Sequence, residues 1–219
     1  MPQIFHPSAN TISKASILGG LFFLAGILTL MGLFFFRSSA WTKVGIPIEQ
    51  PVPFSHKHHV SEIGIDCRYC HTSVEDSSFA GIPPMHTCMT CHSQIFATSP
   101  VLAPVRNSYQ NKVALQWNRV NDLPDYVYFD HEIHIAKGVG CETCHGRVDQ
   151  MPLTEKAHTL YMIWCLDCHR HPEKYLRPSS EILTMGYQPQ NQIAMGQQLF
   201  IQNNIRTPEE LTNCTICHR

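Results

Sequence analysis

The hydropathy pattern separates a short N-terminal part of the 219-residue chain from everything that follows. Residues 17–36 read ILGGLFFLAGILTLMGLFFF, an uncharged run that lies between Lys14 and Arg37. A helix of about 20 apolar residues spans the hydrocarbon core of a bilayer. The pattern therefore predicts a transmembrane helix at 17–36, preceded by a short tail at 1–16.

The same run could belong to a secretory signal peptide, with SSA before Trp41 as a cleavage site. The apolar region of a signal peptide is shorter, about 7–15 residues. The length of the run therefore favours a retained membrane anchor. Basic residues flank both of its ends, so positive charge does not determine its orientation.

After the anchor, the hydropathy pattern becomes irregular. The chain has 15 prolines, and turn-forming stretches such as PVPF, GIPP and RPSS interrupt the apolar segments. Such breaks are typical of loops. We expect a mostly α and irregular domain at 37–219, with short helices, long loops and little sheet.

All ten cysteines of the chain lie in five C-x-x-C-H motifs, CRYCH, CMTCH, CETCH, CLDCH and CTICH. This motif attaches c-type haem, with thioether bonds from both cysteines and the adjacent histidine as proximal iron ligand. Five disulfides would not require a histidine after every second cysteine, and zinc sites that use paired C-x-x-C motifs fit poorly with an odd number. We therefore expect five covalently bound haem c groups.

The predicted attachment residues are Cys67, Cys70, Cys88, Cys91, Cys141, Cys144, Cys165, Cys168, Cys214 and Cys217. The predicted proximal ligands are His71, His92, His145, His169 and His218. Five porphyrins in so short a domain would replace much of the usual side-chain core. Because bacteria attach haem c outside the cytoplasm, we expect a cytoplasmic N-terminus and a haem domain on the periplasmic side of the inner or plasma membrane.

An internal repeat organises the haem motifs. The segment FSHKHHVSEIGIDCRYCH, which begins at Phe54, aligns with FDHEIHIAKGVGCETCH, which begins at Phe129, and a second motif follows each segment. The repeat predicts a haem pair at 54–96, a linker at 97–126, a second haem pair at 127–175 and a single haem at 176–219.

The repeat also offers distal iron ligands. Each copy carries Phe-x-His-x-x-His, which supplies His56 and His59 in the first copy and His131 and His134 in the second. Residues three apart share a face of a helical turn, so the two histidines of a pair could reach two neighbouring haems. A haem iron with a proximal histidine commonly takes histidine or methionine on its other face.

A fifth distal ligand is then still needed. We favour Met151, because a methionine ligand raises the reduction potential and suits a haem where electrons enter or leave. Met162 is the next choice. The other candidates are Met185, His86, His158 and His171.

Charge and motif content narrow the function classes. The formal net charge of −1 gives no indication of nucleic-acid binding, and no nucleophile triad, phosphate loop or carboxylate pair stands out. We therefore expect an electron carrier without a catalytic site of its own. A multihaem reductase is a less favoured alternative, since its open haem often has lysine as proximal ligand and all five motifs here end in histidine.

The chain resembles the pentahaem cytochrome c subunit of bacterial alternative complex III in four stretches. They read FSHKHHVSEIGIDCRYCH, GIPPMHTCMTCHSQI, FDHEIHIAKGVGCETCHG and WCLDCHRHPEKYLRP. The resemblance covers nearly the whole chain, including the single anchor. It implies that the Phe-x-His-x-x-His histidines are iron ligands, and it is compatible with one His/Met haem.

The resemblance also implies partners. In that complex, multi-helix membrane subunits bind quinol, and an iron–sulfur subunit passes electrons to the cytochrome. The cytochrome then reduces a monohaem cytochrome c or another soluble acceptor. The main alternative is a stand-alone, membrane-anchored multihaem quinol dehydrogenase.

Overall fold

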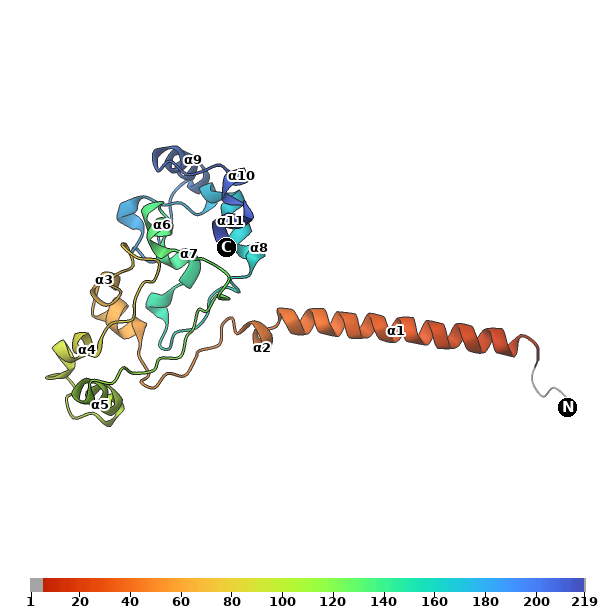
Figure 1. The fold of residues 1–219 in the computed structure, drawn as a ribbon, viewed down its shortest axis with the longest axis horizontal. Helices are drawn as coiled ribbons and strands as arrows, with labels where there is room; N and C mark the ends of the chain where they lie inside the picture. Colours follow the sequence, from red (N-terminus) through yellow and green to blue (C-terminus); the bar gives the residue numbers. More distant parts are fainter. Residues whose placement is uncertain (1–5, 219) are drawn as a thin grey trace. The chain divides into compact units, whose positions relative to one another are not determined.

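The structure is a computed structural model, and it describes residues 6–218. The chain divides between Lys43 and Val44 into two compact units (Figure 1). Each unit is described by itself below.

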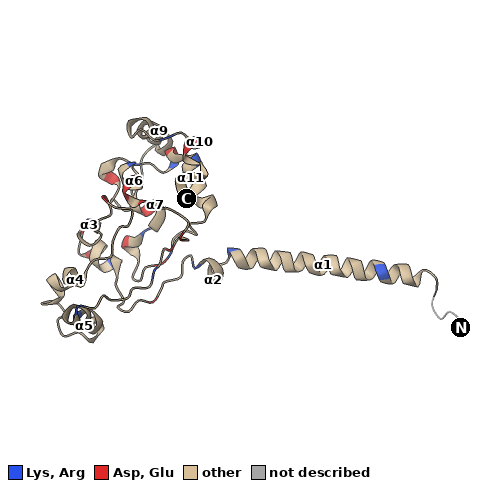
Figure 2. Ribbon diagram, in the orientation of Figure 1, with Lys and Arg blue, Asp and Glu red and all other residues tan. Residues whose placement is uncertain are grey.

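The N-terminal unit is dominated by one helix, α1 (Ala9–Arg37), which is followed by the short α2 (Ser39–Thr42). At 1.5 Å per residue α1 is about 44 Å long, and it is long and apolar enough to cross a membrane. It has no acidic residue, and its basic residues lie only near its two ends (Figure 2). Trp41 packs against the rings of Phe35 and Phe36, with centroids 5.6 and 4.8 Å away.

The helix begins eight residues before the predicted span of 17–36. The apolar run marks the part of the chain that can face lipid, whereas a helix requires only that its backbone hydrogen bonds continue. They continue here through Asn10, Thr11 and Lys14, so hydropathy underestimates the length of the helix.

The second unit consists of short helices joined by irregular segments. Its α-helices are α3 (Cys67–Cys70), α4 (Met85–His92), α5 (Ala103–Asn111), α6 (His131–Ala136), α7 (Cys141–His145), α8 (Met162–Arg170), α9 (Gln192–Gln202), α10 (Pro208–Leu211) and α11 (Cys214–Cys217). The π-helix η1 (Lys57–Glu62) and the 3₁₀ turns η2 (Pro100–Leu102), η3 (Val148–Gln150), η4 (Pro172–Lys174) and η5 (Ser179–Glu181) complete it. Among residues 6–218 there are isolated β-bridges but no strand, which confirms the predicted fold class.

Every C-x-x-C-H motif lies in a short helix, namely α3, α4, α7, α8 or α11. Two of these helices have side-chain caps: Asp66 accepts from the Arg68 amide, and Asn213 accepts from the Thr215 amide. One helical turn brings cysteines that are three residues apart to the same face. Local sequence therefore preforms each attachment site.

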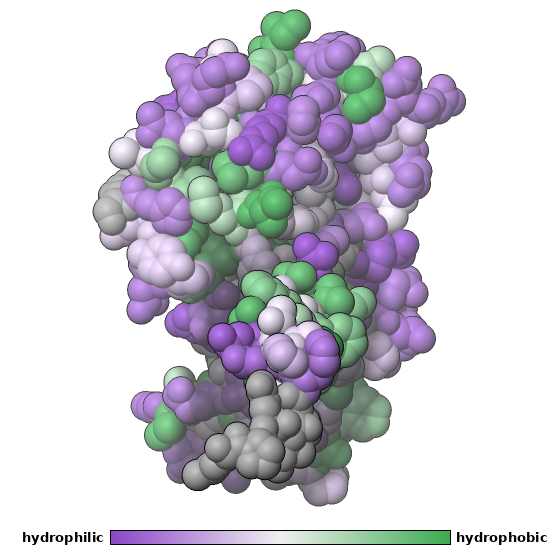
Figure 3. Space-filling model, turned by 90° about the vertical axis from the view of Figure 1, so that its right-hand side faces the viewer, coloured by the Kyte–Doolittle hydropathy of each residue, from purple (hydrophilic) through white to green (hydrophobic). Residues whose placement is uncertain are grey.

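The side-chain core of the second unit is sparse. The buried hydrophobic residues are Val52, Val74, Val105, Val139, Met151, Leu176, Ile182 and Leu199, and only Val139, Leu176 and Leu199 form a cluster. The face drawn in Figure 3 is largely hydrophilic, with hydrophobic residues in scattered patches. A domain of this size usually buries more apolar side chain, so the sparse core fits a domain built around porphyrins.

Three α-helices, α5, α9 and α10, occur where the sequence indicated only loops. Helix α5 lies within the predicted linker 97–126, and Pro104 in its first turn is a helix-start signal. Helix α10 begins with a capping box between Thr207 and Glu210. Both signals are readable in the sequence.

Candidate haem sites

We number the candidate sites after the motifs in chain order. Site 1 is Cys67–His71, site 2 is Cys88–His92, site 3 is Cys141–His145, site 4 is Cys165–His169 and site 5 is Cys214–His218. All ten cysteines lie within the described residues, and no two of them form a disulfide. No group of three or more His, Cys, Asp or Glu side chains within residues 6–218 is placed to hold a metal ion between them. The cysteine pairs therefore stand as separate sites, as haem attachment requires.

Sites 3 and 4 are the more buried ones. Burial raises the pKa of Cys141 to about 11 and the pKa values of Cys144 and Cys168 to about 12. At site 2, in contrast, Cys91 is exposed. The chain thus offers attachment sites that differ in their access to water.

The two copies of Phe-x-His-x-x-His have nearly the same geometry. In the first copy, the Phe54 ring stacks on His59, with centroids 4.4 Å apart, and meets His56 edge-on at 4.9 Å. In the second, Phe129 stacks on His134 at 4.6 Å and meets His131 edge-on at 4.7 Å. The repeat found in the sequence is therefore also a repeat in space.

Three of these distal candidates lie near a proximal histidine, at a ring distance that one metal ion held between the two rings would require. Ring centroids are 6.2 Å apart for His59 and His92, 6.4 Å for His131 and His145, and 6.2 Å for His134 and His169. Two metal–nitrogen bonds of about 2 Å each, with about 1 Å from each nitrogen to its ring centre, span roughly 6 Å. These ring pairs therefore fit the two axial ligands of one iron.

The fourth pair follows from the repeat. His131 pairs with the motif that follows it directly, so the corresponding His56 should pair with His71. Burial lowers the pKa of His56 to about 4, and the next largest effect on this pKa comes from His71, which lowers it further. His56 therefore lies beside site 1, as the repeat requires.

The ring orientation of all nine histidines is fixed at Nδ1. Seven Nδ1 atoms lie 2.6–3.2 Å from a backbone carbonyl. The pairs are His59 with Ser55, His71 with Gly81, His92 with Ile95, His131 with Ser78, His134 with Asp130, His169 with Leu211 and His218 with Tyr126. Because a carbonyl only accepts, Nδ1 carries the proton and Nε2 is left for iron, an arrangement common among metal-bound histidines.

The remaining two histidines have side-chain partners. His56 Nδ1 lies 3.0 Å from Thr154 Oγ1, and His145 Nδ1 lies 3.1 Å from Asn121 Nδ2. Asn121 Oδ1 is buried without a hydrogen-bond partner. Turning this amide by half a turn puts Oδ1 opposite the His145 N–H and pairs an acceptor with a donor. His145 then follows the same rule as the others.

Burial also favours the neutral imidazole that binds metal. It lowers the pKa of His145 to about 4 and the pKa of His134 below its usual range, with neighbouring histidines adding to both effects. A neutral ring keeps a free electron pair on Nε2. The ligand candidates His134 and His145 of the second haem pair thus favour the neutral form, which can bind iron.

Among residues 6–218 the structure shows no second ligand candidate paired with His218 of site 5. His218 packs near the Tyr126 ring, with centroids 5.7 Å apart. Met151 is buried and lines a cavity of about 550 Å³ together with Pro47 and Gly146, whereas Met162 is exposed. Met151 therefore stays a prediction as the fifth distal ligand.

The alternative histidines have other surroundings. His158 stacks on Trp164 at 5.3 Å, His171 lies 3.8 Å from Glu173, and His86 is exposed. His58, between the two histidines of the first pair, contacts Glu62 at 2.7 Å. Of these four, His58 alone has a hydrogen bond at Nδ1 among the described residues, and its partner there is the exposed Glu62 carboxylate.

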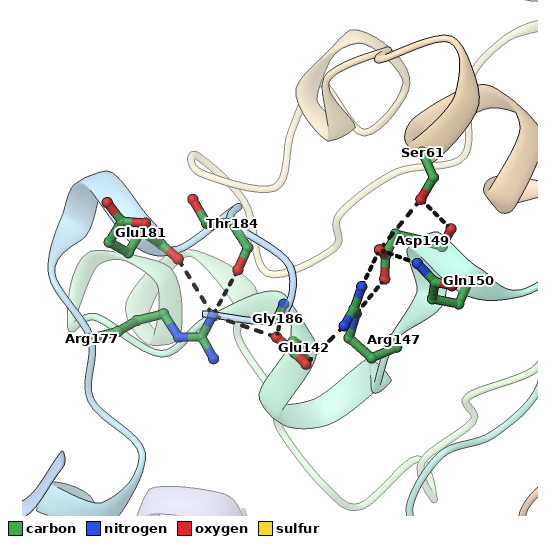
Figure 4. A network of polar contacts seen from close by, with 9 residues as sticks. All are labelled: Ser61, Glu142, Arg147, Asp149, Gln150, Arg177, Glu181, Thr184 and Gly186. Atoms are coloured by element: carbon green, nitrogen blue, oxygen red, sulfur yellow. Dashed lines mark hydrogen bonds and ion pairs between the residues drawn. The ribbon is translucent and has the colours of Figure 1, made fainter. Parts of the chain in front are cut away.

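An ionic network beside site 3 was not foreseen from the sequence (Figure 4). Arg147 donates two hydrogen bonds of 2.8 Å to the buried Asp149, which holds the pKa of that carboxyl below its usual range. Ser61 of η1 donates to the Asp149 carbonyl at 2.6 Å. Glu142, inside motif CETCH, lies 3.9 Å from both Arg147 and Arg177. The network ties the first repeat to the third site.

Comparison with known proteins gives two matches to cytochromes c. Residues 127–219 match the family described as cytochrome c7 and related cytochrome c. Over 98 residues the chain is 39% identical to the menaquinone reductase multiheme cytochrome c subunit of Nitratidesulfovibrio vulgaris. These residues cover 44% of this chain and 46% of the relative. The chain thus spans about half the length of this curated relative. Residues 127–219 are thus similar to cytochrome c7 and related cytochrome c, and the chain carries five attachment motifs for covalent haem c.

Proposed function

We propose that this chain is the membrane-anchored pentahaem electron carrier of a respiratory or photosynthetic complex that converts quinone and quinol. The observation that carries the proposal is the set of histidine ring pairs spaced for one iron each. If each pair held one iron, that iron would have no open position for a substrate. These sites are therefore suited to transfer electrons and not to transform a small molecule.

The bound haems supply one-electron chemistry, and the protein supplies position and electrostatics. The cysteine pairs fix where each porphyrin lies. The hydrogen bonds at Nδ1 fix the orientation and the basicity of each axial imidazole. The apolar α1 would keep the chain at the membrane, close to subunits that bind quinone.

The direction of electron flow has two candidates. The resemblance to alternative complex III favours quinol oxidation, with electrons passing from an iron–sulfur subunit through this chain to a monohaem cytochrome c or another soluble acceptor. The name of the curated relative, a menaquinone reductase subunit, favours the reverse direction. We propose quinol oxidation, with menaquinone reduction as the second candidate.

The partners can be tested in native membranes. After mild detergent extraction, a native gel stained for haem and analysed by mass spectrometry should show this chain with an iron–sulfur protein and multi-helix membrane subunits. If the chain migrates alone and that band oxidises quinol, it is instead a stand-alone quinol dehydrogenase.

The direction can be tested on the purified complex. Menaquinol should reduce the haems, seen in their visible absorption, and a soluble cytochrome c should reoxidise them. If the complex instead passes electrons from reduced cytochrome to menaquinone at a higher rate, the second candidate holds. Carbon monoxide binding to more than one reduced haem would favour a multihaem reductase.

The anchor can be tested on the mature chain. Peptide mass spectrometry of the membrane fraction should recover the segment between Lys14 and Arg37. A mature N-terminus near Trp41 would show that the segment is a cleaved signal peptide.

A further inference from the structure

We infer that the five sites lie in space in one unbranched order, which is site 2, site 1, site 3, site 4 and site 5. Sites 2 and 5 are then the two ends of the electron path. The order rests on contacts within the second unit. Only its meaning as an electron path rests on the proposed function.

Sites 1 and 2 are neighbours. Tyr69, within CRYCH, places its hydroxyl 3.0 Å from Thr90 Oγ1, within CMTCH. Their distal candidates, His56 and His59, touch the same Phe54 ring. The two sites therefore meet both at their attachment helices and at their distal ligands.

Sites 1 and 3 are interlocked. The distal histidine of site 1, His56, is hydrogen bonded to Thr154, which follows the third motif in the chain. The distal histidine of site 3, His131, is hydrogen bonded to the carbonyl of Ser78, which follows the first motif. At each of the two sites, the hydrogen-bond partner of the distal histidine thus comes from the chain segment that follows the motif of the other site. Ser61 and Asp149 add a further bond between the same two regions.

Sites 3 and 4 share helix α6. His131 and His134 are one turn apart on it, and their rings face His145 and His169. A single helical turn thus supplies the distal ligands of both sites. The helix therefore sets the distance between these two distal ligands.

Sites 4 and 5 are joined through a proximal histidine. His169 Nδ1 lies 2.9 Å from the carbonyl of Leu211, the last residue of α10. Leu211 precedes Cys214 of site 5 by three residues. Helix α10 also packs on α8, which carries the fourth motif.

Together these contacts join site 2 to site 1, site 1 to site 3, site 3 to site 4 and site 4 to site 5. The order in space thus differs from the order in the chain by one exchange of sites 1 and 2.

The test uses the full, haem-loaded chain and a light-driven electron donor. A ruthenium photoreductant is attached to a new thiol at Glu209→Cys, an exposed position five residues before Cys214 of site 5. A methionine ligand serves as spectral marker, because it raises the potential of its haem. The marker is placed by His134→Met at site 4 or by His59→Met at site 2. The reduction of the marker is followed in time after a flash.

We expect the site 4 marker to be reduced before the site 2 marker. Moving the photoreductant to Gln94→Cys, which is exposed beside site 2, should reverse this order. Equal times from both attachment points, or the opposite order, would overturn the inference.

If the methionine variants do not load five haems, the iron positions in an electron microscopy map of the unmodified protein decide. The iron of site 1 should then lie between those of sites 2 and 3. An iron of site 2 that lies nearest to site 4 or site 5 would refute the order. Neither experiment involves a partner, so failure of the order and failure of the proposed function are distinguishable.

Discussion

In both haem-pair segments a phenylalanine stacks on the second histidine of the repeat, at 4.4 Å in the first segment and 4.6 Å in the second. The surroundings of the two segments differ. Burial raises the pKa of Cys144 and of Cys168 to about 12 in the second segment, whereas Cys91 in the first is exposed. The repeat thus sets which histidine faces which motif, and the surroundings set the environment of each haem.

This difference matters because burial, axial ligands and hydrogen bonds are the means by which a protein tunes haem potential. If sites 1 to 4 each have the proposed pair of histidine ligands, ligand type alone does not distinguish them. The distinction must then come from burial, from the partners at Nδ1 and from the ionic network at site 3. The following predictions test these parts separately.

The largest effect should come from removing a distal histidine. We expect His134→Ala to open the iron of site 4, and His59→Ala to open that of site 2, since their rings face His169 and His92. One haem in each variant should turn high-spin and bind carbon monoxide when reduced. His58→Ala is the matched control, because its exposed ring contacts Glu62. An unchanged spectrum in His134→Ala would contradict the ligand assignment.

The second effect concerns the ionic network beside site 3, in which Arg147 holds Asp149. Asp149→Asn weakens the paired hydrogen bonds from Arg147. Because Asp149 is only 6% exposed, water replaces these bonds poorly. We expect the haem-loaded protein to melt several degrees lower by calorimetry. Asp122→Asn, which alters an exposed contact with Arg119, should leave the melting temperature unchanged. Equal melting temperatures of the two variants would show that the hydrogen bonds between Arg147 and Asp149 contribute nothing to stability.

The third effect concerns the Asn121 side chain at His145. A stronger acceptor at Nδ1 makes the imidazole more basic and favours ferric iron. Asn121→Asp should therefore lower the potential of site 3, and Asn121→Leu should raise it. A hydrogen bond of about 1 kcal/mol corresponds to about 40 mV for one electron.

A spectroscopic redox titration measures these shifts. Asn118→Leu is the control, because Asn118 lies in the same linker as Asn121 and its side chain donates to the Glu49 carbonyl and not to a haem ligand. Shifts of the same sign in Asn121→Asp and Asn121→Leu would contradict the proposed hydrogen bond.

The smallest effect should come from Tyr69→Phe. The Thr90 hydroxyl donates to the Thr87 carbonyl, so the Tyr69 hydroxyl is the donor to Thr90. Both side chains are exposed, and the bond should contribute about 0.5 kcal/mol. Chemical denaturation should detect a slight loss of stability with unchanged haem spectra. A large loss would mean that the contact between sites 1 and 2 depends on this one bond.

The attachment sites were predictable because C-x-x-C-H is a local motif and its helical turn forms locally. The fold class was predictable for the same reason, since many short helices follow from frequent prolines and capping residues. The ligand pairs were not predictable in detail. That His131 faces His145 while His134 faces His169 depends on how α6 meets α7 and α8.

The partners at Nδ1 were beyond sequence reasoning for a different reason. Most are backbone carbonyls, such as those of Gly81 and Leu211, and a carbonyl does not depend on residue identity. Asn121 and Thr154 come from segments far from the histidines they contact. The distal ligand of site 5 has neither a repeat nor a ring pair to indicate it, so Met151 stays a prediction.

Near-infrared magnetic circular dichroism of the oxidised, haem-loaded protein tests the central claim most directly, because it distinguishes bis-histidine from histidine–methionine ligation. The ring pairs and the repeat predict bis-histidine ligation at sites 1 to 4. The remaining haem should show histidine–methionine ligation if Met151 or another methionine binds it. Three or fewer bis-histidine haems would contradict the account.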